Sequence, residues 1–165
     1  TLFSSQFLCF CRTSSLQIAK SWYGKSKETD RIVKHGMRGL LKKGNTEALK
    51  LFAFKGAEGI KVTGLKLQPE KITVGEKINF GFKIKSEKRQ KIRLEYTIDF
   101  LTSSGKISRK IFKIYENIYE QGQIYSISKN HSFKDLTIRK HFKGRHTLAI
   151  IVNGENLAEK IFKII

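Results

Sequence analysis

The side chains that most clearly suggest a function are lysines and arginines, which gather in two stretches of the chain. One group lies among residues 31–43 and the other among residues 83–93. The chain has 33 lysines and arginines against 14 aspartates and glutamates, a formal net charge of +19. Clustered cations bind polyanions, because each phosphate they neutralise releases counterions. A nucleic acid is therefore the first partner to consider, and an anionic membrane is the second.

The positive charge is shared by both halves of the chain. Residues 1–56 carry 11 basic against 3 acidic side chains, and residues 57–165 carry 22 against 11. Charge alone leaves an alternative open, since many small proteins carry lysine-rich faces that are only solvated. A structural or protein-interaction domain of that kind would scatter its lysines evenly. The grouping near residues 83–93 disfavours this alternative.

Residue types typical of catalysis or metal binding form no recognisable motif. Residues 57–165 contain no Ser/His/Asp arrangement, glycine-rich phosphate loop, paired catalytic carboxylates or zinc-ligand spacing. Cys9 and Cys11 supply only two potential zinc ligands and cannot easily bridge each other, so we interpret them as buried or oxidisable thiols. His131 and His141 are isolated, and His146 is expected to bond nearby backbone. We expect no metal and no cofactor.

The hydrophobic period changes abruptly near residue 56. Residues 14–55 repeat apolar side chains at helical spacing, whereas residues 60–165 alternate apolar and polar side chains in short runs. The sequence therefore predicts an α+β chain of two parts, a helical stub over 1–56 and a β-domain over 57–165. Residues 1–15 are apolar and serine-rich but fit neither a secretory signal nor a transmembrane helix. We interpret them as the tail of a longer chain or as a fragment boundary.

Residues 14–55 predict a series of short helices. Ser14 or Ser15 caps the first helix, which Gly24 ends, and Ser26 or Thr29 opens a longer second helix. Apolar residues of the second helix form one stripe, and basic residues form the opposite face. The stripe comprises Ile32, Val33, Gly36, Met37, Leu40 and Leu41, and the basic face comprises Arg31, Lys34, Arg38 and Lys42.

A third helix completes a tight helical hairpin. Gly44 supplies the left-handed residue that ends the second helix, Asn45 caps the third, and Glu47 lies in its first turn. A hairpin with apolar stripes and a basic outer face is typical of one unit of an α-solenoid. Solenoids need about three or more units, so we expect the neighbouring units upstream of Thr1. Alternatively, the hairpin folds onto the β-domain.

The second half predicts an all-β domain of seven strands. Alternation around residues 78–84 and 92–100 gives each strand one wet face, which places Lys91, Arg93 and Glu95 in solvent. Pro69 and Gly75 bracket a short edge segment. Further strands are predicted over residues 107–114, 124–133 and 146–152, with Asn153-Gly154 turning the chain into the last one. This spacing favours a Greek-key sandwich of the immunoglobulin type.

Four segments carry a resemblance to a known family. They are ETDRIVKHGMRGLLKKGNTEALKLFAFKG (28–56), GLKLQPEKITVGEKINFGFKIKS (64–86), RLEYTIDFLTSSGKISRKIFKI (93–114) and KGRHTLAIIVNG (143–154). Together they resemble the C-terminal part of DNA alkylation-repair proteins built from HEAT-like repeats, the AlkC/AlkD superfamily. The likeness is greatest to the AlkC-type alkylpurine DNA glycosylases, the branch with an appended immunoglobulin-like domain. It covers roughly residues 16–165.

The resemblance implies a full-length protein that grips alkylated double-stranded DNA and hydrolyses the N-glycosidic bond of a cationic purine. It places the catalytic carboxylates in upstream repeats, so the fragment alone is expected to be inactive. Glu28, Asp30 and Glu47 are better explained as first-turn helix charges. The resemblance further implies a monomer in the bacterial cytoplasm, associated with the nucleoid, without a membrane partner or small-molecule cofactor.

Two basic patches are then the expected contacts to the DNA backbone, which position a duplex without reading its sequence. The helical patch comprises Lys34, Arg38, Lys42 and Lys43, and the β patch comprises Lys83, Lys85, Lys88, Arg89, Lys91 and Arg93. The alternative is a stand-alone basic β-sandwich that binds nucleic acid or another partner without any catalytic activity. That alternative predicts an initiator methionine, whereas the sequence begins with Thr1.

Overall fold

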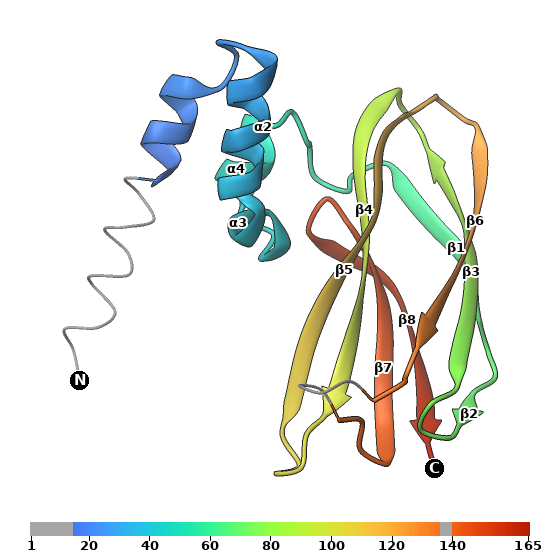
Figure 1. Cartoon of the computed structure of the whole chain (residues 1–165). Helices are drawn as coiled ribbons and strands as arrows, with labels where there is room; N and C mark the ends of the chain where they lie inside the picture. Colours follow the sequence, from blue (N-terminus) through green and yellow to red (C-terminus); the bar gives the residue numbers. More distant parts are fainter. Residues whose placement is uncertain (1–14, 136–139) are drawn as a thin grey trace. The chain divides into compact units, whose positions relative to one another are not determined.

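The chain forms two compact units, one ending at Phe54 and the other extending over Lys55–Ile165. The structure is a computed structural model that describes residues 15–135 and 140–165 (Figure 1). Most of the described residues lie in strands, with a few short helices at the start. The predictions for Cys9, Cys11 and Ser14 fall outside the described residues.

The helical unit follows the local signals of the sequence. Residues 15–22 are helical, and α2 (Lys27–Gly36), α3 (Arg38–Lys42) and α4 (Thr46–Leu51) follow. The Ser26 hydroxyl accepts a hydrogen bond from the Thr29 N–H at 3.1 Å, and the Asn45 side chain accepts one from the Ala48 N–H at 2.9 Å. Gly44 has a φ of +66°, which a glycine adopts without strain. The predicted caps at Ser26 and Asn45 and the turn at Gly44 are thus confirmed.

The prediction of one long second helix is wrong, because the helix breaks after Gly36. Met37 caps α2 and also precedes α3. Glycine lowers helix propensity there. The Met37 N–H still donates to the Val33 carbonyl at 2.9 Å and the Leu41 N–H to the Met37 carbonyl at 3.0 Å. The buried stripe of Val33, Met37 and Leu41 therefore continues across the break, whereas Ile32 is 63% exposed and lies off it.

The core of the helical unit is small and aromatic. Phe52 and Phe54 are almost fully buried, and Tyr23 meets Phe52 edge to face with 5.0 Å between ring centroids. Ile18 and Trp22, one helical turn apart, remain about half exposed. The unit thus retains an apolar surface that its own described residues do not cover.

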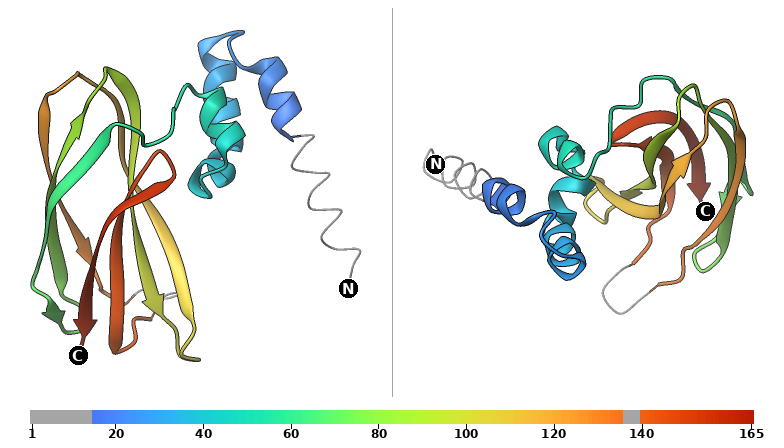
Figure 2. Two further views of the ribbon diagram at one scale, coloured as in Figure 1. Left: turned by 180° about the vertical axis from the view of Figure 1, so that it is seen from behind. Right: turned by 90° about the horizontal axis from the view of Figure 1, so that it is seen from above.

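The β unit consists of two sheets that share one core. The first has the order β1-β3-β6 and the second the order β2-β8-β7-β4-β5. The strands are β1 (Ile60–Gln68), β2 (Lys71–Ile72), β3 (Lys77–Ser86), β4 (Gln90–Leu101), β5 (Ile107–Tyr119), β6 (Ile124–Ser132), β7 (Gly144–Val152) and β8 (Glu155–Ile164). Seen from above, these strands curve around a shared interior (Figure 2).

The core of the β unit is built by the alternating residues of both sheets. Ile78, Phe80, Phe82 and Ile84 of β3 point inward with at most 3% exposure, as their alternation predicts. They share one buried cluster with the apolar residues of β4, β7 and β8. Strand β1 was not among the predicted strands, because Gly64 and a register irregularity between Thr63 and Lys66 interrupt its alternation.

The hairpin between β7 and β8 also holds the start of the β unit. Asn153 and Gly154 have φ angles of +49° and +90°, which confirms the predicted turn. Asn153 is buried, and its amide donates to the Lys55 carbonyl at 2.6 Å while its carbonyl oxygen accepts from the Arg93 N–H at 2.8 Å. Glu155 accepts from the Ala57 N–H at 2.9 Å.

Among the described residues, no helix is long and apolar enough to cross a membrane.

Candidate nucleic-acid interface

Lys83 and Lys85 project from the outer face of the three-stranded sheet. Their neighbours Phe82 and Ile84 point into the core, so the pleat turns both lysines to solvent. Lys61 of β1 lies opposite Lys85 in the register. We call Lys61, Lys83 and Lys85 the lysine face. Its three side chains come from adjacent strands of one sheet, which fixes their spacing.

One member of the lysine face is already paired. The Lys61 ammonium lies 3.0 Å from a carboxylate oxygen of Glu87, and both side chains are exposed. The hydrogen bond from Lys61 lowers the pKa of Glu87 below its usual value, with the attraction of the same ammonium as the second cause. Glu87 thus offsets part of the positive charge at this edge, and Lys83 and Lys85 are the better candidates for a phosphate.

The connection from β3 to β4 carries two more of the predicted residues. Lys88 and Arg89 are exposed there, and the Arg89 Nε lies 3.0 Å from a carboxylate oxygen of Glu120. The Ser86 hydroxyl donates to the Lys88 carbonyl at 2.7 Å, which fixes the turn. Lys91 follows on β4 and is half-buried. The structure therefore gathers most of the β patch at one end of β3 and β4.

The prediction that Arg93 faces solvent is wrong. Its side chain is only 4% exposed, and its guanidinium lies between two carboxylates of the outer sheet face. The Nη2 donates to Glu95 at 2.7 Å, and the Nη1 donates to Glu116 of β5. Lys113 lies 3.2 Å from the same Glu116 oxygen. Alternation predicted a wet face for β4, but Arg93 is buried there and paired with two carboxylates, so it is not available to a phosphate.

The predicted basic residues of the helical unit do not share one environment. Arg38 and Lys43 are exposed, whereas Lys34 and Lys42 are half-buried. The Lys34 ammonium lies about 6 Å from the centroids of Phe52 and Phe54, within reach of a cation–π interaction. Only part of the helical patch is therefore presented to solvent.

The acidic residues of the helical unit lie where helix electrostatics predicts. Glu28 and Asp30 occupy the first turn of α2, and Glu47 the first turn of α4. Asp30 also accepts from the Gly24 N–H at 2.6 Å. The Lys20 ammonium bonds Glu47 at 2.8 Å and lowers the pKa of that carboxyl. The predicted first-turn positions of all three acids are thus confirmed.

His146 makes the backbone contacts that the sequence led us to expect. Its Nε2 lies 3.0 Å from the Phe142 carbonyl, and its Nδ1 accepts from the Leu101 N–H at 3.4 Å. His131 and His141, isolated in the sequence, join it around Phe133 in space. The described residues include no group of three or more His, Cys, Asp or Glu side chains that could hold a metal ion.

We expect the β unit to lose stability as the pH falls from 7 to 5. Burial lowers the pKa of His146 below 6.5, outweighing its backbone hydrogen bonds. The unfolded chain therefore binds the proton at a higher pH, and stability falls through the window below 6.5 until the folded-state pKa is passed. Urea unfolding at several pH values measures this. His146→Gln should flatten the slope, and an unchanged slope would contradict the assignment.

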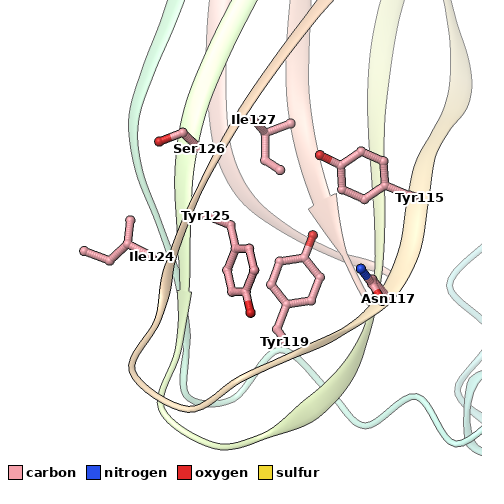
Figure 3. A pocket seen from close by; sticks show the side chains of 7 residues that line it. All are labelled: Tyr115, Asn117, Tyr119, Ile124, Tyr125, Ser126 and Ile127. Carbon is pink, nitrogen blue, oxygen red and sulfur yellow. The ribbon is translucent and has the colours of Figure 1, made fainter.

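A tyrosine-lined pocket was missed by the sequence analysis. It lies between β5 and β6, with a volume of about 460 Å³ (Figure 3). Tyr115, Tyr119 and Tyr125 supply its aromatic rings, and Asn117 supplies an amide. The available signal was that three of the chain's five tyrosines fall between residues 115 and 125. We call these four residues and the space between them the tyrosine pocket.

Comparison with known proteins identifies a family for the β unit. Residues 61–165 match the family described as uncharacterised protein YhaZ, C-terminal Ig-like domain. Uncharacterized protein YhaZ of Bacillus subtilis (strain 168) is 46% identical over 139 residues, which cover 84% of this chain and 39% of that protein. The chain thus spans about two-fifths of the length of this relative.

Solved structures give a matching result. The Pseudomonas fluorescens alkylpurine DNA glycosylase AlkC, bound to DNA containing an abasic site analog, is similar with 33% identity and a TM-score of 0.87. That match covers 91% of this chain and 42% of the glycosylase chain. A β-glucosidase from Erythrobacter marinus, at 10% identity and a TM-score of 0.54 over 64% of this chain and 15% of that chain, shares the fold of that part alone. The family match covers residues 61–165, which are more than half of this chain. The chain therefore belongs to the YhaZ C-terminal Ig-like domain family.

Proposed function

We propose that this chain is the C-terminal part of a DNA alkylation-repair protein of the alkylpurine DNA glycosylase type and contributes DNA backbone binding. The likeness to the DNA-bound AlkC structure over 91% of the chain supports this proposal. The observation that carries it is the lysine face, where Lys83 and Lys85 stand exposed on a rigid sheet. The partner is alkylated double-stranded DNA, and the protein acts as a monomer on the bacterial nucleoid.

The geometry of β3 suits a phosphate backbone. Residues two apart on a strand are about 6.6 Å apart on the same face, and phosphates of one DNA strand recur about every 3.4 Å along the helix axis. Lys83 and Lys85 can therefore each hold a phosphate of one strand. Such contacts position the duplex and carry no sequence information. The immunoglobulin-like unit, proposed as a Greek-key sandwich, is the scaffold that keeps the two ammonium groups apart.

The helical unit contributes in a different way. Arg38 and Lys43 are its exposed members of the helical patch and extend the phosphate contacts. Ile18 and Trp22 form the apolar surface left uncovered. In a full-length relative this surface packs against further helices of a HEAT-like array, as stacked repeats require. Catalytic carboxylates belong to those repeats, since the acids of this unit serve its own helix ends.

Replacing Lys83 and Lys85 together with alanine should weaken duplex binding and its salt dependence. Each lost phosphate contact lowers the slope of log K against log salt by roughly 1, so the double variant should lose about 2. Fluorescence anisotropy with a labelled duplex between 50 and 200 mM salt measures both quantities. Affinity should fall by a similar factor for duplexes of different sequence.

A matched control removes two lysines from the far end of the same unit. Lys106 and Lys110 are exposed near the β4–β5 hairpin, at the opposite end of β4 from the β3–β4 connection. Their double alanine variant loses the same net charge and should retain the wild-type slope. Equal losses in the two variants would show that only net charge matters. If the affinity of the wild type did not depend on salt concentration, the proposal of backbone binding would be wrong.

A further inference from the structure

The tyrosine pocket lies at the open side of the β unit. β5 is an edge strand of the five-stranded sheet, and β6 is an edge strand of the three-stranded sheet. Tyr115, Asn117 and Tyr119 come from β5, whereas Tyr125 and Ile127 come from β6. Figure 3 shows the rings of Tyr119 and Tyr125 side by side between the two strands. The pocket is therefore framed by a strand on each side and opens where, among the described residues, no further strand joins the two sheets.

The lining of the pocket suits a flat, hydrogen-bonding ring. Tyr119 and Tyr125 meet edge to face with 4.6 Å between centroids, while the Tyr115 side chain is 37% exposed. Burial raises the pKa of Tyr119 to about 12 and also raises the pKa of Tyr115. Both hydroxyls thus remain protonated near neutral pH. The Tyr119 side chain is only 2% exposed, so Tyr115 is the ring of this pair that an occupant can reach. Asn117 adds an amide whose oxygen accepts from the Ile118 N–H at 2.9 Å and whose nitrogen can donate to an occupant.

The charges around the pocket favour an occupant that carries phosphate. The Lys129 ammonium lies 5.7 Å from the Tyr115 ring centroid. Across the sheet register, Lys85 lies opposite Ile124 and Lys83 opposite Ser126, two residues at the rim of the pocket. Neutral sugars also stack on tyrosine, but they gain nothing from the Lys129 ammonium beside Tyr115 or from Lys83 and Lys85 on the outer face of the neighbouring strand β3. A ring joined to phosphates satisfies both the aromatic and the cationic side chains.

We propose that the tyrosine pocket binds an unstacked nucleobase of a DNA strand whose phosphates contact Lys129 and the lysine face. This inference rests on the proposed function, because it assumes that DNA reaches the lysine face. Stacking on an aromatic face tolerates any base, since every base presents a π-face. The pocket thus adds a contact that only single-stranded or locally opened DNA can make.

The test compares a labelled twelve-nucleotide oligothymidylate with a base-free deoxyribose phosphate oligomer of equal length. The whole chain should bind the oligothymidylate about tenfold more tightly, because one stacked base contributes a factor of that order. Tyr115→Ala should remove this preference and leave binding of the base-free oligomer and of duplex DNA unchanged. Tyr115→Phe keeps the ring and should retain the preference. Tyr115→Leu replaces the alanine variant if circular dichroism shows it unfolded.

Other outcomes separate this inference from its alternatives. Equal affinity of the wild type for the two oligomers, or a Tyr115→Leu variant that keeps the preference, would overturn it. Binding of a neutral glucan oligosaccharide that Tyr115→Leu abolishes would also overturn it and assign the pocket to sugars. Competition by thymidine monophosphate distinguishes a free nucleotide from a base held within a strand. Failure of the proposed function appears separately, as salt-independent binding of duplex DNA.

Discussion

Replacing Arg93 with methionine should lower the free energy of unfolding of the β unit by about 3–5 kcal/mol. The guanidinium lies between Glu95 and Glu116, whose side chains are 1% and 8% exposed. Removing it leaves Glu95 as a buried carboxylate without its cation, whereas Glu116 keeps Lys113 at 3.2 Å. Urea unfolding monitored by circular dichroism measures the loss.

Two further variants show whether burial is the cause. Arg109→Met breaks the pair with Asp99, which has contacts of 2.6 and 2.7 Å but an Arg109 side chain that is 62% exposed. That change should cost no more than about 1 kcal/mol. Adding Glu95→Leu to Arg93→Met removes the buried Glu95 carboxylate and should recover most of the lost free energy of unfolding. A single variant that loses as little as Arg109→Met would show that the cluster is solvated.

Replacing Phe133 with alanine should lower the free energy of unfolding by a similar amount, about 3–5 kcal/mol. Phe133 is fully buried, and its ring lies 5.0 Å from His131, 5.2 Å from His141 and 5.3 Å from Phe162. The lost ring leaves a cavity whose walls are held by both sheets, so collapse cannot fill it. Thermal unfolding and urea titration measure the change.

The control variant replaces Phe133 with a smaller apolar side chain that fills much of the cavity. Phe133→Leu should cost less than about 1.5 kcal/mol, because a leucine side chain still fills part of the space between the histidines and Phe162. Ile107→Ala, at a residue 71% exposed in the β4–β5 hairpin, should have almost no effect. A small loss for Phe133→Ala would mean that the cluster of rings rearranges to refill the site.

Local sequence signals predicted the ends of elements better than their burial. Ser26, Asn45 and the Asn153-Gly154 turn act through bonds and backbone angles within a few residues, so their chemistry is legible in the sequence. The alternation of β3 was equally informative, because one of its faces is the core. Predictions of this kind need no knowledge of distant neighbours.

Burial of the polar side of β4 could not be predicted, since it depends on a pairing across strands. Arg93, Glu95 and Thr97 alternate with apolar residues as solvent-facing side chains do, yet all three are buried. The missing fact was that register places Glu116 of β5 opposite Arg93. For the same reason, the basic residues could be nominated from the sequence as contacts, but only the structure separates the exposed Lys83 from the buried Arg93.

The edge position of β5 has a consequence for self-association. Its thirteen residues leave one row of backbone donors and acceptors without a neighbouring strand in the five-stranded sheet. Lys110 is exposed along that rim beside Arg109 and Lys113, whose charges Asp99 and Glu116 partly offset, so a second copy approaching strand to strand still meets positive charge. Positive side chains thus attract a polyanion and also disfavour self-association through the β5 edge. High salt should weaken both the attraction and the repulsion.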